Sequence, residues 1–171
     1  MSKDKLSLKE IKALPPIFFL KLINKMKKKL KMDPLVEEIF KEYDLSIDEM
    51  EFIPMAFGDL DVSAKCDHGV IYFNYSLLCD GDFEEDYSYA IHEMTHFCQQ
   101  TTGSKATKSS DDGSYLDNPH EQEGFTNQVE YIATHHGEEE AEEYVDNLLD
   151  HHEIDNKKEI KEKKEILLSK V

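Results

Sequence analysis

The sequence predicts an α+β fold, and two observations lead to it. Residues 70–73, which are rich in β-branched and aromatic residues, predict a short strand, and 51–57 and 62–66 are also read as strands. The segments on either side repeat apolar residues every three or four positions, a spacing typical of amphipathic helices. A length of 171 residues suits one domain, and 9 Phe and 8 Tyr argue against a disordered chain.

Residues 1–32 form a Lys-rich amphipathic N-terminal segment, which we predict to be helical with a break at Pro15 and Pro16. A basic amphipathic helix can bind a membrane surface or an acidic protein partner. The simpler interpretation is that the segment packs on the domain, while its lysines face water or the acidic residues of the same chain.

Residues 33–153 form the main domain, and its helices can be placed from their starts. Asp33 and Pro34 are suited to the N-cap and the first helical position of a helix. Asp82 is suited to the N-cap of a helix over 83–100. An Asn-Pro pair begins another helix over 119–136.

The turns and the C-terminal end are predicted from local composition. The tripeptide 67–69 indicates a hairpin turn, in which Gly69 suits a positive φ. Residues 101–117 are polar and predict a mobile loop, and residues 138–151 predict an acidic helix after a glycine. The tail, 154–171, is rich in Lys and Glu and is expected to be a solvated or frayed helix.

Charge is distributed very unevenly along the chain, whose net charge is −17. Residues 1–31 hold ten Lys against two acids, whereas residues 32–156 hold 32 acids against four Lys. Such an acidic body repels phosphate, which excludes general nucleic-acid binding by it. The longest apolar run has four residues, too short for a membrane span or signal peptide, and three cysteines show no pairing pattern. We therefore expect a cytoplasmic protein, of a bacterium or a phage-infected cell.

The pattern His92-Glu93-x-x-His96 is the main chemical signal in the sequence. Histidines four apart on a helix project from one face and can share one Zn²⁺ ion. Glu93 can reach a water on that ion and act as general base, which makes it the predicted catalytic residue. By composition alone, this pattern is expected about 0.05 times in such a chain.

A hydrolytic zinc ion normally needs a third protein ligand, and the candidates follow Asn118. Glu121 falls where its carboxylate can fold back on the N–H of the cap residue. Glu123 lies deeper in the helix and is the preferred third ligand, with Asn127 one turn later to hydrogen-bond it. Glu121 remains the alternative.

With these residues in view, the chain resembles the gluzincin zinc metallopeptidases, in particular small minigluzincin-like proteins of bacteria and phages. The resemblance rests on His92-Glu93-x-x-His96, on Glu123-x-x-x-Asn127 and on the Asn-Pro-x-Glu-x-Glu string, and it covers about residues 50–136. The residue four after His96 is Gln100 and not a histidine, so a three-histidine site with that spacing does not fit. The resemblance makes 33–153 a zincin-like domain: a small antiparallel sheet packed on the active-site helix, then a mostly helical part. It also implies a peptide cleft along an edge strand, for which 70–74 is the candidate.

The resemblance implies hydrolysis of peptide bonds by a zinc-activated water, with a further donor for the oxyanion. Tyr115 is the first candidate for that donor, followed by His120 or His135, although a packing role for Tyr115 is the more common one. The predicted function is thus a zinc-dependent metallopeptidase acting on a peptide or protein. The alternatives are a catalytically weak zincin-fold binding or regulatory protein, and a phage structural protein with a fortuitous motif.

Overall fold

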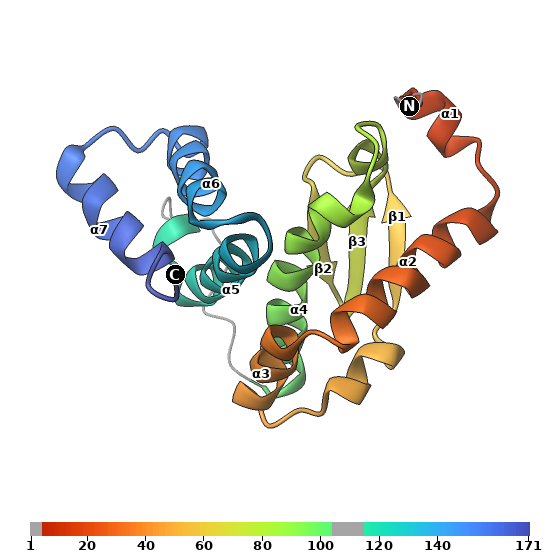
Figure 1. The fold of residues 1–171 in the computed structure, drawn as a ribbon, viewed down its shortest axis with the longest axis horizontal. Coiled ribbons are helices and arrows are strands. Elements are labelled where there is room, and N and C mark those ends of the chain that lie inside the picture. Colours follow the sequence, from red (N-terminus) through yellow and green to blue (C-terminus); the bar gives the residue numbers. More distant parts are fainter. Residues whose placement is uncertain (1–4, 104–114) are drawn as a thin grey trace. The chain divides into compact units, whose positions relative to one another are not determined.

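The computed structural model of the chain describes residues 5–103 and 115–171. It divides the chain into two compact units, Met1–Gly103 and Ser104–Val171. The first unit holds the sheet, and the described residues of the second unit are mostly helical (Figure 1). The predicted α+β fold class is therefore confirmed. Most of the loop predicted over 101–117 lies outside the described residues.

The first unit begins with helices and continues with strands and short 3₁₀ turns. In chain order these elements are α1 (Leu8–Lys12), α2 (Pro16–Lys31), α3 (Pro34–Glu42), η1 (Ile47–Phe52), β1 (Met55–Gly58), β2 (Ala64–Asp67), β3 (Val70–Asn74), η2 (Tyr75–Leu78), η3 (Phe83–Asp86) and α4 (Tyr87–Thr101). The predicted helix break and the predicted Asp33 cap, which accepts a hydrogen bond from the Leu35 N–H, are both confirmed.

The three strands form one sheet in the order β1-β3-β2. β2 pairs antiparallel with β3, but β1 pairs parallel with β3. Two expectations from the resemblance are therefore wrong: the sheet is mixed instead of antiparallel, and the 70–74 strand is central. Parallel pairing joins residues about 16 positions apart in sequence, Met55 with Ile71 for example, and no local pattern specifies it.

The turn between β2 and β3 is the predicted hairpin turn. His68 and Gly69 both have positive φ, 50° and 75°, which a two-residue hairpin of this hand requires. The strand predicted over 51–57 is shorter than expected, because η1 occupies its first residues and β1 begins only after Pro54. Proline has no N–H to give to a neighbouring strand, so a strand start just after it is physically reasonable.

One face of the sheet is covered by helices. Ile71, Phe73 and Phe57 are buried on that face, whereas Lys65 lies over the ring of Tyr72 on the other. Phe57 contacts both Phe19 of α2 and Phe83 just before α4, with ring centroids 5.5 and 5.1 Å apart. The aromatic cluster thus ties α2, the sheet and the start of α4 together.

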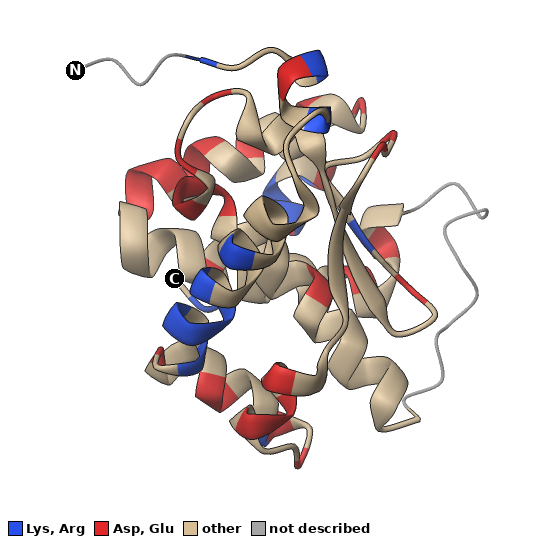
Figure 2. Cartoon of the chain, turned by 90° about the vertical axis from the view of Figure 1, so that its right-hand side faces the viewer, with Lys and Arg blue, Asp and Glu red and all other residues tan. Residues whose placement is uncertain are grey.

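The Lys-rich N-terminal segment packs against the rest of the first unit. This agrees with the simpler of the two interpretations, in which the segment covers its own domain. α2 buries Ile23, Met26 and Leu30, and its lysines lie along the outer side of the helix (Figure 2). Lys27 Nζ donates to the carbonyl oxygen of Ile53 at 2.5 Å, and Lys31 Nζ lies 3.0 Å from Asp48. The lysines therefore face acidic and carbonyl groups of the same unit.

The second unit consists of η5 (Tyr115–Asp117), α5 (Pro119–His136), α6 (Glu138–His151) and α7 (Lys157–Leu167) in its described residues. α5 and α6 begin and end where the sequence predicted. Their core also includes α7, because Leu167 is buried with Val129, Val145 and other apolar residues. The expectation of a solvated or frayed tail is wrong: apolar residues at helical spacing give α7 a buried side.

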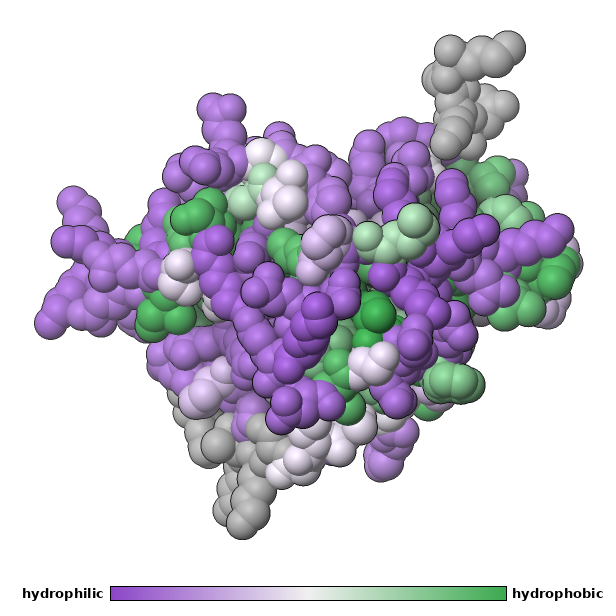
Figure 3. All heavy atoms as spheres, turned by 60° about the horizontal axis from the view of Figure 1, so that its bottom comes forward, coloured by the Kyte–Doolittle hydropathy of each residue, from purple (hydrophilic) through white to green (hydrophobic). Residues whose placement is uncertain are grey.

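One face of the molecule is shown by the hydropathy of its residues in Figure 3. In the face shown in Figure 3, hydrophilic residues predominate and hydrophobic ones form small separate patches. Among the described residues, no helix is both long and apolar enough to cross a membrane.

Candidate metal centre

α4 carries the motif in the part of the helix that is buried most completely. Asp82, predicted to be the N-cap of a helix over 83–100, caps instead the 3₁₀ turn η3 by accepting from the Glu84 N–H. α4 itself begins only at Tyr87, so the predicted helix starts later than expected. Ala90, Ile91, Met94 and Cys98 anchor the helix in the core. Because so much of this helix is covered, His92 and Glu93 are also buried, with 5% and 7% of their surfaces exposed.

His92 and His96 face each other one helical turn apart. Their Nε2 atoms are 3.0 Å apart, and the ring centroids are separated by 4.7 Å at an interplanar angle of 76°. Two nitrogens on one tetrahedral zinc ion lie about 3.3 Å apart, given Zn–N distances of about 2.0–2.1 Å. The pair is therefore close to the geometry that a shared ion needs.

Gln99 contacts the second histidine from the same helix. Its Oε1 lies 2.8 Å from Nδ1 of His96, the ring nitrogen away from His92. Sequence analysis did not identify Gln99. The spacing of three residues from His96 is the signal that could have found it, since such residues are neighbours on a helix.

Glu93 lies near β2 of the sheet. Burial raises the pKa of the Cys66 thiol on β2 to about 12, and the negative charges of Glu93 and Asp67 add to that effect. The Cys66 Sγ also lies 3.7 Å from Oε1 of Gln100. The position of Cys66 near the predicted general base could not be predicted from the sequence, because the sheet and the helix meet only in the folded chain.

The start of α5 differs in detail from the expectation for Glu121. Oδ1 of Asn118 accepts from the His120 N–H at 3.0 Å, as an N-cap does. The Asn118 N–H, to which Glu121 was expected to fold back, donates to the carbonyl oxygen of Tyr115 at 3.4 Å. The Asn118 N–H thus has a backbone acceptor, so the cap does not require the Glu121 carboxylate, and the reason for setting Glu121 aside as a ligand loses its force.

Glu123 and Asn127 lie one turn apart on α5, as the sequence predicted. Glu123 is partly buried, and Asn127 is completely buried. Oδ1 of Asn127 accepts from Nζ of Lys170 at 2.8 Å, a contact from the C-terminal end that no sequence pattern indicated. The ammonium group of Lys170 also lies 4.0 Å from a carboxylate oxygen of Glu130.

Tyr115 and the other oxyanion candidates lie in the second unit. The Tyr115 ring is stacked on His152, with centroids 5.3 Å apart, and contacts the edge of Phe125 at 5.9 Å. These contacts are those of a packing tyrosine. His135 contacts the ring of Tyr131 at 4.3 Å near the exposed end of α5, and His120 is partly buried in the first turn.

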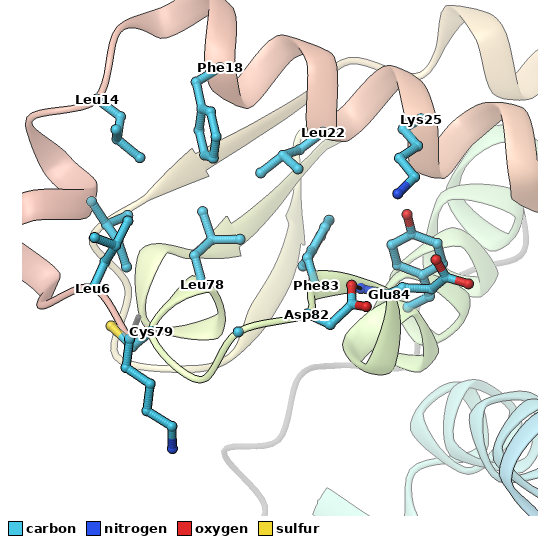
Figure 4. A pocket seen from close by; sticks show the side chains of 14 residues that line it. Leu6, Leu14, Phe18, Leu22, Lys25, Leu78, Cys79, Asp82, Phe83 and Glu84 are labelled. Carbon is cyan, nitrogen blue, oxygen red and sulfur yellow. Dashed lines mark hydrogen bonds between the residues drawn. The ribbon is translucent and has the colours of Figure 1, made fainter. Parts of the chain in front are cut away.

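A pocket of about 280 Å³ in the first unit is separate from the motif residues. Leu14, Phe18 and Leu22 of the N-terminal segment point into it toward Leu78 and Phe83 (Figure 4). None of the predicted metal ligands lines this pocket, so the chemistry of α4 does not depend on it.

The structure thus places His92, Glu93 and His96 together on α4, and both candidate carboxylates on α5. Comparison with protein-family models, with curated proteins and with solved structures finds no match for this chain.

Proposed function

We propose that the protein is a zinc-dependent metallopeptidase. The observation that carries the proposal is the pair of histidines on α4, His92 buried and His96 partly buried, whose Nε2 atoms lie 3.0 Å apart with Glu93 next in sequence to the first of them. Zinc binding alone does not need that glutamate, whereas hydrolysis needs a base beside the ion.

The donor set fits zinc. His92 and His96 offer two imidazole nitrogens at nearly the separation that a tetrahedral ion requires. Nδ1 of His96 is bonded to Gln99, and a metal-ligating histidine usually makes such an outer hydrogen bond with its second nitrogen. Imidazole and carboxylate together suit zinc better than magnesium or calcium, which prefer oxygen ligands.

We favour Glu121 over Glu123 as the third ligand. Two imidazoles and the Glu121 carboxylate would make a donor set of the kind that hydrolytic zinc sites use. The N-cap of α5 is completed by His120 and Tyr115, so the capping role that Glu121 was expected to play is already filled. Glu123 remains the alternative, and the two carboxylates can be tested separately.

The ion, when bound, would lower the pKa of a coordinated water and polarise a carbonyl group. Glu93 would take the proton from the attacking water and deliver it to the amine that leaves. The carboxylate belongs to a helix that is buried along most of its length, so its position is fixed before substrate binds.

The peptide substrate would bind along β2. Because β3 is central, β2 is the edge strand next to α4, and its Cys66 lies near Glu93. A peptide that adds to this edge by main-chain hydrogen bonds would run past the proposed base. Strand addition reads the backbone more than the side chains, so it suits peptides as a class of substrate.

The test is zinc content and cleavage in Glu93→Gln, with Glu142→Gln, an exposed change on α6, as matched control. After dialysis, the wild type and both variants should hold one zinc per chain. Cleavage of a mixture of random-sequence fluorogenic peptides should fall roughly 10²–10⁴-fold in Glu93→Gln only. Absence of stoichiometric zinc from the wild type would overturn the proposal, and full activity of Glu93→Gln would remove its mechanism.

A further inference from the structure

Gln99 is a buried polar residue that the proposed mechanism does not use. Only 4% of its surface is exposed, although glutamine is usually found on the outside of proteins. It lies one turn beyond His96 on α4, and its Oε1 is 2.8 Å from Nδ1 of that histidine. A buried amide needs hydrogen-bond partners, and this one has an imidazole nitrogen as a partner.

The contact determines which ring nitrogen of His96 carries the proton. A neutral imidazole has one N–H and one lone pair, and an amide oxygen can only accept. The Oε1 of Gln99 therefore requires the proton to be on Nδ1 of His96. The lone pair is then on Nε2, the nitrogen that faces His92.

We propose that Gln99 is a positioning residue that holds His96 in the Nδ1–H tautomer and so keeps its Nε2 ready for a divalent ion. The ion-binding part of this inference rests on the proposed function, whereas the tautomer part does not. Gln99 also fixes the angle of the ring, because its own side chain is enclosed by the core.

The neighbouring glutamine provides a matched control. Gln100 is exposed, and its Oε1 faces the thiol of Cys66 and not a histidine. Gln99→Met and Gln100→Met make the same chemical change one residue apart on the same helix. Gln99→Glu restores an acceptor at the same place and serves as the conservative variant.

The first measurement is the tautomer of His96 in the metal-free full-length chain, read from nitrogen-15 spectra of histidine-labelled protein. In the wild type, Gln100→Met and Gln99→Glu, His96 should carry its proton on Nδ1. In Gln99→Met the proton should move wholly or partly to Nε2. Circular dichroism reports whether each variant is folded, and Gln99→Asn, one methylene too short to reach, replaces Gln99→Met if that variant does not fold.

The second measurement is zinc affinity, by competition with a chelator. Gln99→Met should bind zinc roughly 10- to 100-fold more weakly than the wild type, the usual cost of losing an outer partner of a ligand. Gln100→Met and Gln99→Glu should stay within a few-fold of the wild type.

The two measurements separate this inference from the proposed function. An unchanged tautomer and unchanged affinity in Gln99→Met would overturn the inference while the wild type still bound zinc. The wild type could instead bind no zinc while the tautomer of His96 changed in Gln99→Met. That result would overturn the proposed function and support the control of His96 by Gln99.

Discussion

α4 and α5 both carry residues of the candidate metal centre, but different kinds of contact hold those residues in place. On α4, the imidazole of His96 is held by Gln99, three residues away on the same helix. On α5, the buried Asn127 is held by Lys170, 43 residues later in the chain. Local spacing therefore describes the first helix well, whereas the second depends on contacts that a sequence pattern does not contain.

The largest expected effect is the loss of zinc from the histidine pair. His92→Ala should lower zinc affinity by more than the roughly 10- to 100-fold caused by removing an outer partner, because a direct ligand is lost. His136→Ala, at the exposed end of α5, is the matched control and should bind as the wild type does. Equal zinc content in the two variants after dialysis would show that His92 of α4 is not a zinc ligand.

The next effect compares the two carboxylates of α5. We expect Glu121→Gln to weaken zinc binding roughly 100-fold or more and Glu123→Gln to weaken it much less, because a neutral amide is a poor zinc ligand. Chelator competition on both variants measures the difference. The reverse order would identify Glu123 as the ligand, as the sequence alone suggested.

A smaller effect tests the long-range contact of α5. Lys170→Met removes the donor to the buried Asn127 and should lower the free energy of unfolding by about 1 kcal/mol, measured by urea denaturation. Lys161→Met, on the exposed side of α7, should leave it unchanged. Equal stability of the two variants would show that the C-terminal residues do not support α5.

The smallest effect concerns pH and the start of α4. Burial raises the pKa of Asp86 to about 6, and the charges of Glu85, Asp80 and Asp82 add to this. Since the pKa in the folded protein lies above 3.8, the ordinary value for an aspartate, the ionised carboxyl destabilises the fold. The free energy of unfolding should therefore fall as the pH rises from about 4 to about 6.

Asp86→Asn removes that penalty. Above pH 6 the variant should be more stable than the wild type by about 1 kcal/mol, a figure reduced for solvent screening of a partly exposed group. Asp61→Asn, an exposed change at a residue that does not act on Asp86, is the control. Denaturation curves at pH 4 and pH 7 give the comparison, and parallel pH dependence in the wild type and Asp86→Asn would contradict the assignment.

The sequence predicted the helices best where local signals mark their ends. Asn118 and Pro119 start α5, and Gly137, with φ of 104°, separates it from α6. The hairpin turn at His68 and Gly69 was equally clear, because few sequences favour two successive positive φ angles. Each of these signals acts within a few residues, so each can be read directly.

Other features could not be predicted because they depend on tertiary contacts. The parallel pairing of β1 with β3 brings together segments separated by β2. The packing of α7 was hidden by its many charges, although Lys163 is buried and pairs with Asp117. No spacing rule distinguishes Glu121 from Glu123, so the choice of third ligand depends on contacts that only the folded chain makes.

The thiol of Cys66 has a chemical consequence of its own. With a pKa of about 12, only about one molecule in 10⁵ carries the thiolate at neutral pH. Alkylating agents react with the thiolate form, so this sulfur should react slowly while it lies in its partly buried place on β2. Iodoacetamide should therefore modify Cys66 much more slowly in the folded protein than in the unfolded chain.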